Sequence, residues 1–122
     1  MLITISGVLS RDELEDVREQ ALGLRWRDGS QTAGEAARRV KRNEQADLGS
    51  RAGVKLRELL MARISGHPVL RAAARPKRLS RPLLSRAGEG GGYGLHVDNA
   101  LMGQGDNTIR SDVSYTLFLS DP

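Results

Sequence analysis

The spacing of apolar residues predicts a first helix near residues 11 to 22. Its start is marked by a capping box, in which the Ser10 side chain and the Glu13 side chain satisfy each other's backbone N–H groups. Gly23 is placed to end it. The apolar stripe of this helix consists of Leu14, Val17 and Ala21, with Leu24 just beyond.

A second helix is expected near residues 51 to 65, and its pattern is the clearest in the chain. Ser50 is a suitable N-cap, and Gly66 followed by Pro68 is expected to end the helix. The apolar stripe consists of Val54 (or Ala52), Leu56, Leu59, Leu60 and Ile64.

Alternating apolar and polar residues predict strands in three places. These are Leu2 to Ile5, Tyr93 to Asn99, and Asp112 to Leu119. In the last of them Val113, Tyr115, Leu117 and Leu119 share one face. The composition of Glu35 to Arg39 would allow a further helix, so the segment leading to residues 40–43 has no single interpretation at this point.

The composition describes one small domain over residues 1–122. Nineteen Lys plus Arg against 15 Asp plus Glu give a net charge of +4, which permits anionic partners without requiring them. Cysteine is absent, so any metal must be held by His and carboxylate ligands. No membrane partner is expected, because no stretch has the roughly 18 apolar residues of a span. Met1 to Leu9 lacks the pattern of a signal peptide, which makes the cytoplasm the expected location.

A basic stretch raises the alternative of nucleic-acid binding. It has six cations and no acid, but it also has no aromatic side chain on which a base could stack. A solvated face is the favoured interpretation, and a nucleic-acid partner is not expected. The cations are Arg71, Arg75, Lys77, Arg78, Arg81 and Arg86.

Candidate metal chemistry is concentrated at His96 and Asp98. In an extended segment these two side chains point to one face, because strand side chains alternate with period two. An imidazole and a carboxylate are two of the three ligands of the 2-His-1-carboxylate triad that holds Fe(II). The third ligand has to come from elsewhere. His67, just after the second helix, is better explained as a capping or solvated residue.

Two runs of sequence carry a resemblance to a known family. Tyr93-Gly94-Leu95-His96-Val97-Asp98-Asn99-Ala100 and the segment from Arg110 to Pro122 resemble the PKHD-type hydroxylases, bacterial Fe(II)/2-oxoglutarate dioxygenases. The likeness extends upstream in order through Trp26 and the Asp28-Gly29 turn, where Trp26 is expected to be a packing anchor. It also includes Val40-Lys41-Arg42-Asn43, for which it favours extended structure, and it is broken at Ala87, where the family has an aromatic residue.

The resemblance implies an α+β fold, with N-terminal helices packed on an incomplete double-stranded β-helix (jelly roll) sheet. It covers roughly the first half of a family member, without the distal histidine and the arginine that binds 2-oxoglutarate. It implies His96 and Asp98 as Fe(II) ligands, 2-oxoglutarate and O2 as cosubstrates, and ascorbate as a cofactor. The substrate that it implies is a small molecule or is unknown. The 122-residue chain alone is expected to be inactive. Half a jelly roll has open edges, so pairing with another chain, including a homo-oligomer, is possible.

Two alternatives remain beside a dioxygenase. One is a non-catalytic remnant of the same family, and the other is a small basic nucleic-acid-binding protein in which the His-x-Asp pattern is accidental.

Overall fold

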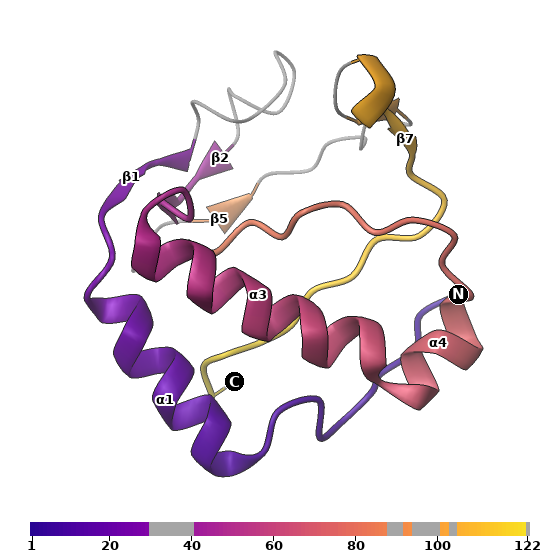
Figure 1. Cartoon of the computed structure of the whole chain (residues 1–122), viewed down its shortest axis with the longest axis horizontal. Helices are drawn as coiled ribbons and strands as arrows, with labels where there is room; N and C mark the ends of the chain where they lie inside the picture. The colour runs from indigo at the N-terminus through magenta and orange to yellow at the C-terminus, as the bar shows by residue number, and fades with distance from the viewer. Residues whose placement is uncertain (30–40, 88–91, 94–100, 103–104, 122) are drawn as a thin grey trace.

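Three helices and short antiparallel strands make up the described part of the chain (Figure 1). The computed structural model describes residues 1–29, 41–87, 92–93, 101–102 and 105–121. The helices are α1 (Arg11–Leu22), α3 (Arg51–Gly66) and α4 (Pro68–Ala74), and a short 3-10 helix covers Gly105–Asn107. The architecture is therefore α+β, as predicted.

The strands form three separate ladders. A three-stranded sheet has the order β1 (Trp26–Asp28), β3 (Glu44–Ala46), β4 (Ser85–Arg86). In a second ladder β2 (Lys41–Arg42) pairs with β5 (Gly92–Tyr93). In the third, β6 (Leu101–Met102) pairs with β7 (Ile109–Arg110). All four pairings are antiparallel.

Helix α1 has the predicted bounds, and the capping box that predicted them is formed. The Glu13 N–H donates to the Ser10 hydroxyl over 3.2 Å, and the Ser10 N–H donates to the Glu13 carboxylate over 3.1 Å. The Gly23 N–H donates to the carbonyls of Gln20 and Ala21 and ends the helix. Both ends of α1 are thus fixed by residues within one turn of the helix.

Helix α3 begins where Ser50 predicts, since the Ser50 hydroxyl accepts from the Gly53 N–H over 3.1 Å. The helix ends at Gly66, as predicted. The prediction missed the further helix α4, whose first turn contains Pro68. A first-turn proline loses no hydrogen bond there, since the first N–H groups of a helix have no partner within it. Arg75, with φ 46°, then ends α4 in the left-handed conformation.

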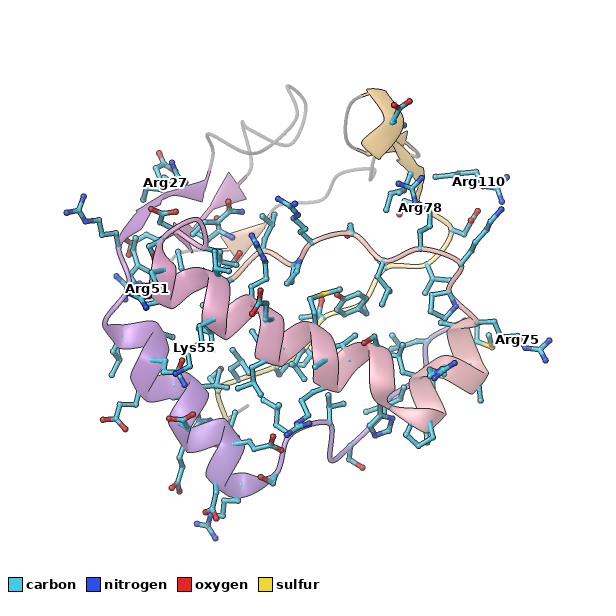
Figure 2. The ribbon with its side chains drawn as sticks, viewed as in Figure 1. Arg27, Arg51, Lys55, Arg75, Arg78 and Arg110 are labelled. Atoms are coloured by element: carbon cyan, nitrogen blue, oxygen red, sulfur yellow. The ribbon has the colours of Figure 1, made fainter. Side chains whose placement is uncertain are left out.

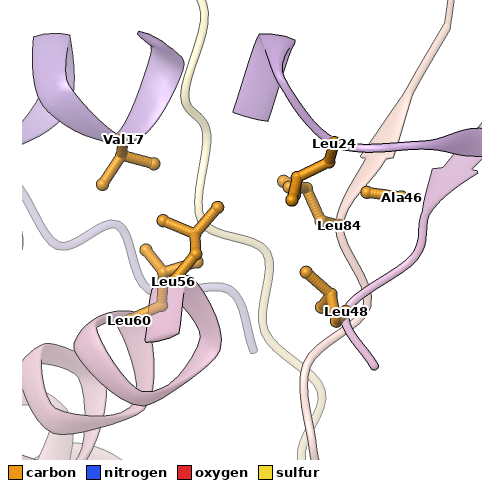
Figure 3. Close-up of a cluster of buried hydrophobic side chains, with 7 residues drawn as sticks. All are labelled: Val17, Leu24, Ala46, Leu48, Leu56, Leu60 and Leu84. Carbon is orange, nitrogen blue, oxygen red and sulfur yellow. The ribbon is translucent and has the colours of Figure 1, made fainter. Parts of the chain in front are cut away.

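The core lies between α1, α3 and the three-stranded sheet (Figure 3). Its most deeply buried side chains are Val17 of α1 and Leu56 of α3. Trp26 packs against the cluster, and its indole N–H donates to the Ala21 carbonyl over 3.1 Å, which confirms the packing role expected for it. The buried cluster consists of Val17, Leu24, Ala46, Leu48, Leu56, Leu60 and Leu84.

The open question about residues 40–43 is answered for Lys41 and Arg42, which are extended in β2. Two other strand predictions were wrong. Leu2 to Ile5 has no strand partner among the described residues, and Met1 and Leu2 are fully exposed. Asp112 to Leu119 also lies outside the ladders, and the strand in this region is Ile109–Arg110. Alternation favours a strand but does not supply the neighbour that its backbone needs.

The predicted jelly roll is not confirmed, because the described strands are two or three residues long and fall into three ladders. That part of the fold prediction remains a prediction. Within the described ranges, no helix has the length and apolarity needed to cross a membrane.

Candidate metal site

Strand β5 leads directly into the predicted metal motif. Tyr93 pairs with Lys41 and Gly92 pairs with Arg42, so β2 holds the chain three residues before His96. His96 and Asp98 themselves lie outside the described residues. Their assignment as metal ligands therefore remains a prediction, as does the extended conformation of residues 94–99.

The rest of the described chain offers no competing metal site. No group of three or more His, Asp or Glu side chains that could hold a metal occurs among the residues the structure describes. Several carboxylates there are paired with arginines, such as Glu13 with Arg63 and Glu44 with Arg86. Carboxylates neutralised in this way are poorly suited to binding a cation.

His67, the other histidine, lies at the junction of α3 and α4. Its backbone N–H donates to the Ile64 carbonyl over 3.3 Å and caps α3, but this bond does not involve the imidazole for which a capping or solvated role was expected. The imidazole makes no capping hydrogen bond, and its Nδ1 is buried without a partner in the described part of the chain. Nothing in this environment brings carboxylates to His67 to form a metal site.

A cation, an aromatic ring and a carboxylate meet on the three-stranded sheet, which the sequence interpretation did not predict. The Arg86 guanidinium lies 4.2 Å from the centroid of the Trp26 ring, and its Nε is 3.3 Å from Glu44. Their strands become neighbours only in the fold, since β4 is 42 residues from β3 along the chain. Of these three residues, Arg86 lies two positions before the glycine-rich stretch of the sequence, Gly88 to Gly94, which includes β5.

The basic stretch is exposed, which both a solvated face and a nucleic-acid face require, so the interpretation as a solvated face stays a prediction. All six of its cations are exposed, and Arg75 points away from the domain in Figure 2, whereas Arg78 lies beside the turn before β7. Arg78 also has a structural role, because it donates to the carbonyls of Thr108 and Asp106 over 3.1 and 3.4 Å. One cation of the stretch, Arg78, therefore stabilises the turn before β7.

Among the residues that the structure describes, two ionisable groups have shifted pKa values. The pKa of Glu13 is lowered, chiefly by the hydrogen bond from the Ser10 N–H and then by the side-chain hydrogen bond from Arg63. The pKa of Tyr115 is raised because burial disfavours its charged form. Glu13 stabilises the start of α1.

Comparison with known proteins gives consistent matches along the whole chain. A PKHD-type hydroxylase of Hyphomonas neptunium is 53% identical over 121 residues, which is 99% of this chain. PKHD-type hydroxylases of Shewanella sp. (strain ANA-3) and Shewanella baltica (strain OS155) are 41% and 43% identical over 122 residues. The chain spans about half of the length of these relatives, 54% in each case. No family model matches the chain.

Proposed function

We propose that this chain, which belongs to the PKHD-type hydroxylases, contributes metal ligands to an Fe(II)- and 2-oxoglutarate-dependent dioxygenase. The chain spans about half of the length of the family members that it matches. The observation that carries the proposal is the motif from Tyr93 to Ala100, which stands within a 53% match extending over nearly the entire chain. We further propose that this hydroxylase acts in the cytoplasm. The chain does not identify its substrate.

The donor set fits the proposed ion. His96 would supply an imidazole nitrogen and Asp98 a carboxylate oxygen, which are the ligand types of the facial triad. The chain has no cysteine, so a thiolate site for a softer metal is excluded within it. The chemistry that Fe(II), 2-oxoglutarate and O2 supply in such a site is hydroxylation of a substrate C–H bond, coupled to decarboxylation of 2-oxoglutarate to succinate.

The described residues support this proposal because they anchor the chain segments that precede the motif. The β2–β5 ladder holds Tyr93, so the motif begins from an anchored strand and not from a free loop end. Upstream, Leu84 is buried in the core and Ser85 pairs with Gln45, which anchors the chain before the glycine-rich stretch. Ligands held on anchored elements keep their geometry better than ligands on loops.

The proposal is tested in a full-length protein in which this chain replaces the matching 121 residues of the Hyphomonas neptunium relative. We expect succinate release when Fe(II), 2-oxoglutarate, O2, ascorbate and substrate are supplied. Either His96→Ala or Asp98→Ala should abolish it, because each removes a metal ligand. His67→Ala is the matched control and should retain it, since His67 lies at the α3–α4 junction.

Metal binding gives a second readout that does not depend on a suitable substrate. Equilibrium dialysis of the same protein with Co(II) should show one bound ion, lost in His96→Ala and retained in His67→Ala. Unchanged Co(II) binding in both His96→Ala and Asp98→Ala would contradict the proposed ligands.

A further inference from the structure

Helix α4 is held to the domain by few buried groups. Leu70 and Ala74 are half-buried, and none of the seven residues of the helix is fully buried. Its N-cap residue, His67, makes no side-chain capping hydrogen bond. Isolated helices of this length are unstable in water, and most helical stability in proteins comes from packing an apolar face. Covering the exposed part of α4 would therefore stabilise the helix.

The exposed part of α4 includes an apolar face. Val69, Ala72 and Ala73 are all exposed, and Val69 keeps 51% of its surface in water. The two alanines follow Val69 by three and four positions, so the three side chains are neighbours on the helix surface. Small side chains beside a larger one allow another helix to approach closely, because the distance between packed helices depends on the side chains at the contact.

Two arginines border this apolar face. Arg71 and Arg75 are exposed and four positions apart, so they are neighbours on the next side of the helix. Neither forms an ion pair within the described ranges. No acidic residue stands between Glu58 and Glu89 in the sequence, so the nearby chain supplies no carboxylate to neutralise them. The apolar face of α4 is thus flanked by two unneutralised cations.

Arg75 also has an unusual backbone conformation. Its φ of 46° and ψ of 52° lie in the left-handed region, and no other non-glycine residue in the part of the chain that the structure describes has a positive φ. A glycine usually occupies this position at a helix end, because a side chain makes the conformation unfavourable. Residues held in such conformations are concentrated at binding and switch sites. Figure 2 shows Arg75 pointing away from the domain, where a partner could reach its guanidinium.

We propose that α4 is a docking helix for an acidic, amphipathic helix of another protein. The partner would cover Val69 and the two alanines with its apolar side chains and pair its carboxylates with Arg71 and Arg75. An apolar centre with a charged rim is the usual arrangement of a protein–protein interface. A solvated basic face would explain the arginines but not the apolar residues beside them. This docking goes beyond the proposed hydroxylase activity and does not involve the metal motif.

Other occupants fit these observations less well. Single-stranded nucleic acid is bound by stacking on aromatic side chains, and α4 has none. A membrane surface requires a larger apolar face than one valine and two alanines provide. A second copy of this chain would bring the same net charge of +4, and like charges oppose association. Charge complementarity therefore favours an acidic polypeptide.

The test uses the full-length protein in which this chain replaces the matching 121 residues of the Hyphomonas neptunium relative. The probe is a fluorescent peptide of repeated Glu-Leu-Ala-Glu units, whose leucines recur every four positions and so share one side of a helix. We expect saturable binding by fluorescence anisotropy that weakens as NaCl is added, because salt screens exposed ion pairs. The same peptide with glutamine in place of glutamate should not bind.

Two charge reversals separate α4 from the general positive charge of the chain. Arg75→Glu should weaken peptide binding by about tenfold or more, because it places a carboxylate against the carboxylates of the peptide. Arg51→Glu is the matched control, since it changes the net charge equally and Arg51 is exposed at the opposite end of the molecule in Figure 2. It should change the affinity by less than about twofold, because distant exposed charges are screened.

A second pair of variants tests the apolar contact. Val69→Ser should weaken peptide binding by about threefold or more, because it removes apolar area that the peptide would bury. Leu22→Ser is the matched control, since Leu22 of α1 is 76% exposed and lies on a different element. It should leave the affinity unchanged. Circular dichroism of each variant checks that the helices are intact.

Several results would overturn the proposal. Absence of peptide binding would show that α4 is not available for docking in the full-length protein. Equal weakening by Arg75→Glu and Arg51→Glu would reduce the effect to net charge, and unchanged affinity in Val69→Ser would remove the apolar contact. Tighter binding of a DNA duplex or of phosphatidylglycerol vesicles than of the peptide, lost in Arg75→Glu, would assign the helix to those partners. These measurements use neither metal binding nor succinate release, so they are distinguishable from a failure of the proposed activity.

Discussion

The guanidinium of Arg86 lies over the ring of Trp26, 4.2 Å from its centroid, and joins the two outer strands of the three-stranded sheet. Arg86 also approaches Glu44 of the central strand, with 3.3 Å between Nε and the carboxylate oxygen. The cation therefore links β4, β3 and β1. Because Trp26 packs on the core, this contact connects the sheet surface to the buried cluster.

Arg86→Ala should lower the free energy of unfolding by about 0.5–1 kcal/mol, since it removes a partly exposed cation–π contact together with a surface ion pair. Arg81→Ala is the matched control, because Arg81 is an exposed cation of the same basic stretch with no ion pair in the described part of the chain. It should change stability by less than about 0.5 kcal/mol. Urea unfolding followed by circular dichroism measures both, and equal effects would show that the Trp26 contact adds no stability.

The first turn of α3 depends on a glycine that faces backbone. A Cβ at Gly53 would lie 2.6 Å from both the Asp47 carbonyl oxygen and the Leu48 Cα, where no flexible side chain can move aside. Gly53→Ala should therefore destabilise the protein by about 1–3 kcal/mol. Gly66→Ala, in the last turn of the same helix, meets nothing within 4 Å and should be neutral or stabilising by up to about 1 kcal/mol. Thermal unfolding of the two variants compares these effects, and a neutral Gly53→Ala would disprove the close approach.

Glu13 should make stability depend on pH in the acidic range. Its pKa in the folded protein is lowered by the Ser10 N–H and by Arg63, so the folded state binds a proton less readily than the unfolded chain. The resulting stabilisation is complete above the usual value of 4.5 and is lost as the pH falls through the lowered pKa. Melting temperatures measured across this range should fall more steeply in the wild type than in Glu13→Gln. Glu19→Gln is the matched control, because it alters another carboxylate of α1. Its melting temperature should fall with decreasing pH as steeply as that of the wild type.

The predictions that succeeded depend on signals within a few residues of each other. Ser10 and Glu13 specify the start of α1 by contacts between residues three apart, and Ser50 does the same for α3 through Gly53. Such local signals need no knowledge of the rest of the fold. The predicted bounds of both helices were accordingly correct to within one residue.

The strand predictions required partners that are distant in sequence. Trp26 pairs with Ala46 and Lys41 with Tyr93, and nothing in the alternation of either segment identifies the other. Leu2 to Ile5 and Asp112 to Leu119 have the strand pattern but no described neighbour. Arg86 and Trp26 were missed as a pair for the same reason. For the candidate site, chemistry identified His96 and Asp98 as ligand types, while their placement remains a prediction.

The final prediction concerns the 122-residue chain alone, which should not turn over 2-oxoglutarate. The facial triad needs two histidines and a carboxylate, and the chain has only His67 and His96. His67 is committed to the α3–α4 junction, where its backbone caps α3 and its Nδ1 is buried. Two protein ligands hold a divalent ion loosely, so Fe(II) should be removed readily by a chelator. Succinate release with Fe(II), ascorbate and 2-oxoglutarate should therefore remain at the level of a protein-free control. Turnover that is abolished by His96→Ala but not by His67→Ala would show instead that the chain completes its site in another way, for example with His96 of a second copy.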